Sequence, residues 1–89
     1  MIQESQPALA PASRAALDDE SRRIRRLQVV VRLALSIIAE GQLPYAEAAE
    51  LAAATRRVAL TLFPDSSETF DLLYAPKFRQ LIREVYRLQ

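Results

Sequence analysis

Acid–base and nucleophilic catalysis require side chains whose pKa can be tuned toward neutral pH, and histidine and cysteine are the usual ones. The 89-residue chain contains neither, so any reaction would depend on carboxylates. Asp18, Asp19 and Glu20 are consecutive, and consecutive side chains on a helix point in different directions. Glu47 and Glu50 share a helix face, but they suit the positive end of a helix dipole. The sequence therefore predicts a protein that is not an enzyme and has no catalytic residue.

Sites for metals and cofactors also lack the residues they need. A structural zinc site uses cysteine and histidine ligands, which are absent. Phosphate-binding loops need several glycines, whereas Gly41 is the single glycine of the chain. We expect no metal, no cofactor and no small-molecule ligand.

The charge of the chain is nearly balanced, with 12 basic and 11 acidic residues and a formal net charge of +1. No global field therefore favours nucleic acid or an anionic membrane. The basic run of residues 22–26 has Asp18 and Asp19 at i,i+4 spacing before Arg22 and Arg23, which favours ion pairs along a solvated helix face. Eleven of the twelve basic residues are arginine, a bias typical of a bacterial-like, GC-rich coding sequence.

Arginine is also the better residue for protein interfaces, because its guanidinium pairs with a carboxylate in a bidentate manner. Three arginines recur at helical spacing near the C-terminus, beside a tyrosine. Another lies among alanines in the middle of the chain, where it either extends to water or pairs with a carboxylate across an interface. The candidate partner surface consists of Arg56, Arg79, Arg83, Tyr86 and Arg87.

Residues 43–64, LPYAEAAELAAATRRVALTLFP, are predicted to form the central helix that positions Arg56. At 100° per residue, Leu51 and Leu62 fall on one arc with several alanines. Pro44 suits the first helical turn, and Pro64 suits the position just after the end. Alanines 46, 49 and 53 form a second, small-residue flank, so neighbouring helices can approach closely on two sides.

The helix before it should begin between Arg14 and Glu20 and end at Gly41. Its apolar arc is unusually wide, and half of that arc is enough to face the central helix. The stretch from Leu27 to Ala39 is too short for the roughly 20 residues of a membrane span, and Arg32 interrupts it. The remaining apolar residues are therefore predicted to contact a second copy of the chain: Val30, Leu33 and Ile37.

The connections predict a compact helical arrangement. Gly41 suits a left-handed helix cap before a tight turn, which would make the first two helices an antiparallel hairpin. Asp65 and Glu68 match the spacing of a capping box that opens a short helix. Pro76 disfavours helix at the residue before it, so a last amphipathic helix is expected from Lys77 to about Leu88.

Residues 1–13 hold two prolines and no apolar run, which predicts a flexible tail before a single domain of residues 14–89. The tail lacks the basic and apolar regions of a secretory signal, so a cytoplasmic location is expected.

One segment has a local resemblance to a known family. Residues 45–59, YAEAAELAAATRRVA, resemble the first helix and the start of the recognition helix of helix-turn-helix domains of the sigma-factor type. The resemblance implies a DNA-binding regulator that uses residues 45–62, with Arg56 and Arg57 as its base or phosphate contacts. It requires a turn near Ala53, whereas the periodicity favours one continuous helix.

The sequence as a whole predicts an all-α fold. We expect a small antiparallel bundle of three main helices and one short helix, completed by homo-oligomerisation. The expected function is that of a self-associating adaptor or regulatory module that acts through protein–protein contacts. Its partners would be a second copy of itself and another protein, with DNA binding as the alternative.

Overall fold

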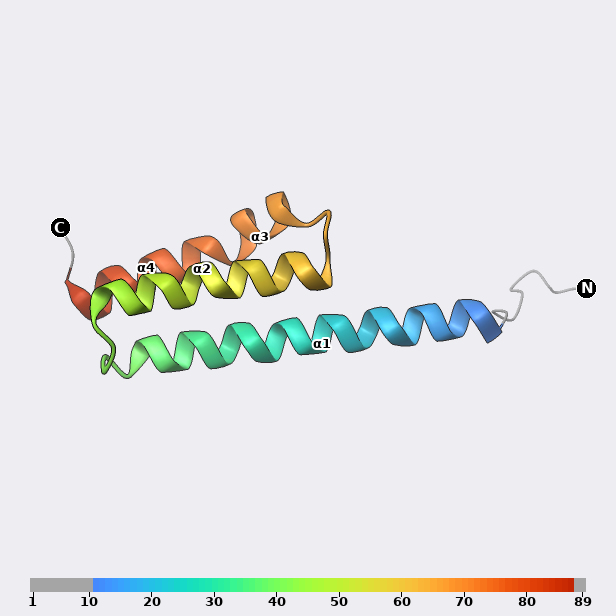
Figure 1. Ribbon diagram of the computed structural model, residues 1–89, viewed down its shortest axis with the longest axis horizontal. Helices are drawn as coiled ribbons and strands as arrows, with labels where there is room; N and C mark the ends of the chain where they lie inside the picture. The colour runs from blue at the N-terminus through green and yellow to red at the C-terminus, as the bar shows by residue number, and fades with distance from the viewer. Residues whose placement is uncertain (1–10, 88–89) are drawn as a thin grey trace, which may run out of the picture.

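A computed structural model describes residues 11–87 of the chain. It confirms the all-helical fold: four helices pack against one another, and residues 11–87 contain no strand (Figure 1). The helices are α1 (Pro11–Ala39), α2 (Tyr45–Leu62), α3 (Ser67–Leu73) and α4 (Ala75–Tyr86).

Helix α1 begins earlier than the sequence predicted. Its first residue is Pro11, whereas we expected a start between Arg14 and Glu20. Proline is well suited to a first helical turn, because the N–H that it lacks has no partner there. Residues 11–13 of the predicted tail thus belong to α1, and residues 1–10 lie outside the described residues.

Helix α1 is also much longer than its neighbours. Its 29 residues span about 43 Å at 1.5 Å per residue, against about 27 Å for the 18 residues of α2. The N-terminal part of α1 therefore extends beyond the other helices as an arm (Figure 1). Every residue from position 13 to position 26 is exposed.

Helix α2 is continuous from Tyr45 to Leu62, so the turn near Ala53 that the helix-turn-helix resemblance requires is not formed. Pro44 is the N-cap residue rather than part of the first turn, and its carbonyl accepts main-chain hydrogen bonds from Glu47 and Ala48, both at 3.0 Å. Before it, Gly41 adopts a φ of 71°, the left-handed conformation that its type predicted.

The capping box predicted at Asp65 and Glu68 does not form. Helix α3 has Ser66 as its N-cap residue, without a side-chain capping bond. The Ser66 hydroxyl instead donates a hydrogen bond to the Phe63 carbonyl at 2.6 Å, within the turn that follows α2. This local bond occupies the Ser66 hydroxyl, which therefore does not cap α3.

Helix α4 begins at Ala75, two residues before the predicted start at Lys77. Pro76 lies in its first turn, where the missing N–H has no cost, and this outweighs the tendency of proline to disfavour helix at the preceding residue. Tyr74 ends α3 and also caps α4, so the two helices follow each other without a linker.

The core is small, because only nine of the described residues are buried and three of them are alanines. Ile38 is the largest fully buried side chain among the described residues. Thr55 is buried as well, and its hydroxyl donates to the Leu51 carbonyl of its own helix at 2.8 Å. The apolar members of the core come from all four helices: Val31, Ala34, Ile38, Ala48, Ala59, Phe70, Phe78 and Ile82.

Candidate interaction surfaces

An open groove of about 390 Å³ lies between α2, α3 and α4, and no residue of α1 lines it. Its floor is apolar, with small side chains from α2 and larger ones from α3 and α4. Three arginines form its rim. We call this the arginine groove and define it by the floor residues Ala49, Ala52, Ala53, Phe70, Phe78 and Ile82 and the rim residues Arg56, Arg79 and Arg83.

The groove follows from the alanine-rich composition of α2. Ala49 and Ala53 are four residues apart and therefore lie on one face, one turn apart. Alanine has no side chain beyond Cβ, so the space between α2 and α4 is hollowed here instead of being filled. Phe70 and Phe78 close the bottom of the groove, with ring centroids 6.5 Å apart.

Arg56 is held at one side of the groove by a bidentate ion pair. Its Nε donates to Asp71 Oδ1 at 2.8 Å, and its Nη2 donates to Asp71 Oδ2 at 3.0 Å. The hydrogen bond from Arg56 lowers the pKa of Asp71 below its ordinary value, and Arg79 adds a smaller attraction of the same sign. The hydrogen bond to Asp71 likewise raises the pKa of Arg56. Arg56 thus pairs with a carboxylate of its own chain while its side chain stays 40% exposed, and the predicted pairing across an interface stays a prediction.

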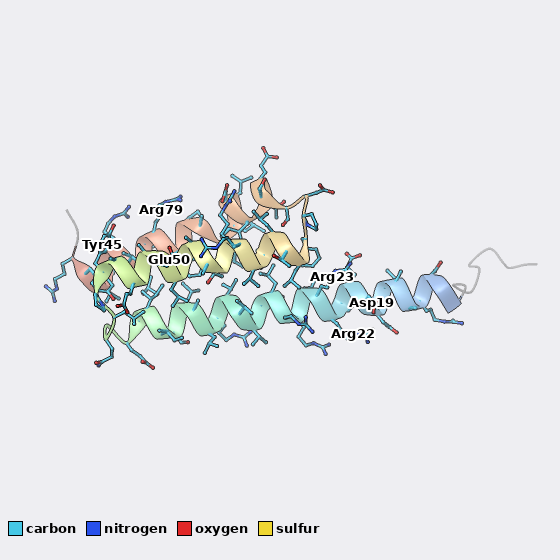
Figure 2. The ribbon with its side chains drawn as sticks, in the orientation of Figure 1. Asp19, Arg22, Arg23, Tyr45, Glu50 and Arg79 are labelled. Atoms are coloured by element: carbon cyan, nitrogen blue, oxygen red, sulfur yellow. The ribbon has the colours of Figure 1, made fainter. Side chains whose placement is uncertain are left out.

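Arg79 and Arg83 differ from Arg56 because neither has an ion pair within 4.0 Å among the described residues. Both are exposed and lie one turn apart on α4. Arg79 projects from α4 on the side turned away from α1 (Figure 2). The α4 wall of the groove thus carries two positive charges in a row.

Two members of the predicted partner surface lie elsewhere. The Tyr86 ring packs edge-to-face on Tyr45, with centroids 6.0 Å apart, and its hydroxyl donates to the Leu43 carbonyl at 2.5 Å. Arg87 follows α4 in a left-handed conformation with a φ of 55°. The structure therefore gathers Arg56, Arg79 and Arg83 at one groove and separates Tyr86 and Arg87 from it.

A second surface contains the residues predicted for self-association. Val30, Leu33 and Ile37 of α1 lie beside α2 and line a shallow apolar depression of about 170 Å³. Leu33 is 58% exposed. The α2 residues that complete this surface were not predicted, although Val58 lies at the edge of the apolar arc of α2. We call it the α1–α2 apolar face and define it by Val30, Leu33, Ile37, Leu51, Ala54 and Val58.

The basic run of α1, residues 22–26, is partly neutralised by an acidic residue. The ion pair that forms is not one of the two that the sequence predicted. Asp19 pairs with Arg22, three residues away, instead of with Arg23 (Figure 2). Arg23 instead lies over the ring of Phe63, with its guanidinium carbon 5.6 Å from the ring centroid. The expected pair of Asp18 and Arg22 is not formed, because i,i+3 spacing also brings side chains together on a helix.

The arginines that the DNA-binding alternative requires are both in ion pairs. Arg56 is paired with Asp71, and the Nη2 of Arg57 lies 2.5 Å from Glu50 Oε2. A phosphate contact at either position would compete with a carboxylate of the same chain.

Comparison of the chain with protein-family models, with curated proteins and with solved structures finds no match. Within residues 11–87, no helix combines the length and the apolar character that crossing a membrane requires. The same residues contain no group of three or more acidic side chains arranged to hold a metal ion.

Proposed function

We propose that the chain is a non-enzymatic helical interaction module that self-associates through the α1–α2 apolar face and binds another protein in the arginine groove. In this proposal the long helices form an antiparallel bundle, and a second copy completes its core. The observation that carries the proposal is the exposure of Leu33, 58%, within an apolar surface formed by two helices.

The small size of the core supports self-association. A domain of this length buries a modest part of its surface, and here alanines make up three of the eight buried apolar residues. Small domains with such cores commonly gain stability from a disulfide, a metal or oligomerisation. Because the sequence has neither cysteine nor histidine, a disulfide and a zinc site are not open to this chain, which leaves close helix packing or oligomerisation, and the alanine-rich core favours the second.

The apolar composition of the α1–α2 apolar face supports a second copy of the chain as its partner. In a two-fold dimer the same surface meets itself, so an apolar patch is matched by an identical apolar patch. No charged side chain lines the α1–α2 apolar face, so this part of the contact would bury no unpaired charge.

Light scattering on the purified protein tests the proposal. We expect a dimer or larger species at micromolar concentration for the wild type and a shift toward monomer for Leu33→Glu. Leu72→Glu is the matched control, because Leu72 is 72% exposed on α3 and lies outside the face, so this variant should associate like the wild type. A wild-type chain that stays monomeric and folded at millimolar concentration would refute self-association.

A further inference from the structure

We propose that the arginine groove binds an amphipathic helix of a partner protein, with an apolar stripe bordered by acidic residues one turn apart. This inference rests on the part of the proposed function that assigns the groove to a partner. It does not depend on self-association, because the α1–α2 apolar face shares no residue with the groove.

The floor of the groove suits the apolar stripe of a helix. Ala49 and Ala53 allow the backbone of an incoming helix to approach α2 closely, since no longer side chain separates them. Phe78 and Ile82 lie one turn apart on α4 and complete the apolar floor opposite these alanines, where as core residues they present only a small part of their surface. A helix laid in such a groove is recognised through apolar residues at i, i+3, i+4 and i+7 spacing.

The charges of the rim select acidic residues on the partner. Arg79 and Arg83 stand about 5–6 Å apart at their Cβ atoms, as residues one turn apart do. Two carboxylates one turn apart on a partner helix have the same spacing. Each guanidinium can take one carboxylate through two parallel hydrogen bonds, which fixes the register of the partner.

The ion pair of Arg56 makes the two sides of the groove differ in charge. Asp71 pairs with Arg56 and attracts Arg79 more weakly, so it would repel a further carboxylate most strongly near Arg56. Arg79 and Arg83 have no such ion pair among the described residues. The acidic border of the partner helix should therefore lie along α4, while its apolar stripe faces the alanines of α2.

Fluorescence anisotropy with designed peptides tests this inference. The probe is a fluorescein-labelled 16-residue helical peptide that has leucines at i, i+3, i+4 and i+7 and two glutamates one turn apart beside them. A second peptide carries lysines in place of the glutamates. We expect the glutamate peptide to bind the wild type and the lysine peptide to bind at least about tenfold more weakly.

Two variants show whether binding occurs in the groove. Arg79→Glu combined with Arg83→Glu should lower the affinity for the glutamate peptide at least about tenfold and raise the affinity for the lysine peptide. The control combines Arg25→Glu with Arg32→Glu, which changes the net charge equally on exposed positions of α1 outside the groove. It should alter binding less than about twofold, since exposed distant charges are screened by salt.

Ala53→Gln adds bulk to the floor without changing charge and keeps a good helix former at an exposed position. This variant should bind the glutamate peptide more weakly than the wild type does, while its circular dichroism spectrum stays that of the wild type. Equal binding of both peptides, or binding that neither the arginine variant nor Ala53→Gln changes, would overturn the inference. Displacement of the peptide by duplex DNA or by phosphatidylglycerol vesicles would also overturn it, in favour of a polyanion site.

Self-association is measured separately, so the two proposals fail independently. Leu33→Glu should still bind the glutamate peptide, because Leu33 lies outside the groove. Loss of peptide binding in a monomeric but folded Leu33→Glu variant would show that the groove requires the dimer, which contradicts the inference as stated.

Discussion

The hydroxyl of Tyr86 donates a hydrogen bond to the main-chain carbonyl of Leu43, 43 positions earlier in the chain, at 2.5 Å. The bond joins the end of α4 to the connection between α1 and α2. It also satisfies a carbonyl in a loop that has no helical partner. Tyr86 therefore connects the end of α4 to the loop between α1 and α2.

Replacing Tyr86 with phenylalanine removes this hydrogen bond and keeps the ring that packs on Tyr45. A hydrogen bond of this kind contributes about 0.5–1.5 kcal/mol to the free energy of unfolding. At roughly 4–8 °C per kcal/mol for a domain of this size, the melting temperature should fall by about 2–12 °C. Thermal unfolding followed by circular dichroism measures this change in melting temperature.

Tyr74→Phe is the control for this variant, because the structure gives no hydrogen bond of the Tyr74 hydroxyl among residues 11–87. Its melting temperature should match that of the wild type. Equal effects of the two substitutions would mean that the bond to Leu43 adds nothing to stability.

The continuity of α2 predicts the cost of glycine in its middle. Ala53 is exposed and Ala54 half-buried, so substitution there tests helix propensity with little loss of packing. Each alanine-to-glycine change should cost about 0.8–1 kcal/mol, and the double variant roughly 1.5–2 kcal/mol. The corresponding fall in melting temperature is about 6–16 °C. An unchanged or raised melting temperature would indicate a turn at Ala53.

The ion pair between Arg56 and Asp71 predicts how stability depends on pH. The pKa of Asp71 in the folded chain is lowered below its ordinary value of 3.8 by the hydrogen bond from Arg56. The unfolded chain therefore takes up this proton first as the pH falls. The stabilisation is fully present well above pH 3.8 and is lost as the pH falls below that value through the lowered pKa.

A carbon-13 titration of the Asp71 carboxyl by NMR measures the effect directly. The pKa of Asp71 should rise toward its ordinary value in Arg56→Gln. It should also rise in 1 M salt, because the pair is exposed and salt screens it. A pKa that is the same in wild type and Arg56→Gln would show that the pair does not persist in solution.

Binding to duplex DNA should be no tighter than non-specific association, roughly 10⁻⁴ to 10⁻⁶ M at physiological salt. The net charge is +1, and Arg56 and Arg57 are already paired with carboxylates. Electrophoretic mobility shifts at several salt concentrations measure the affinity for duplex DNA. A sequence-selective complex at nanomolar concentration, abolished by replacing Arg56 and Arg57, would restore the helix-turn-helix interpretation.

The sequence by itself determined the helical class and the approximate position of each helix. Periodic apolar residues, Gly41 and Pro64 act within a few positions along the chain, and the preferences they impose are local. Local rules failed where two of them competed. At Pro76 the tolerance of a first helical turn outweighed the restriction on Ala75, and before α3 the N-cap position fell on Ser66 instead of the predicted Asp65.

Only the tertiary structure decided which side chains share a surface. Arg56 and Arg79 are 23 positions apart, and whether both border one groove depends on how α2 and α4 pack, which no local pattern specifies. The same holds for Asp71, whose pairing with Arg56 depends on where α3 lies, and for Tyr86, whose hydroxyl finds its acceptor 43 positions away. Periodicity gives the face of a helix on which a residue lies, but contacts between helices depend on the packing of whole faces.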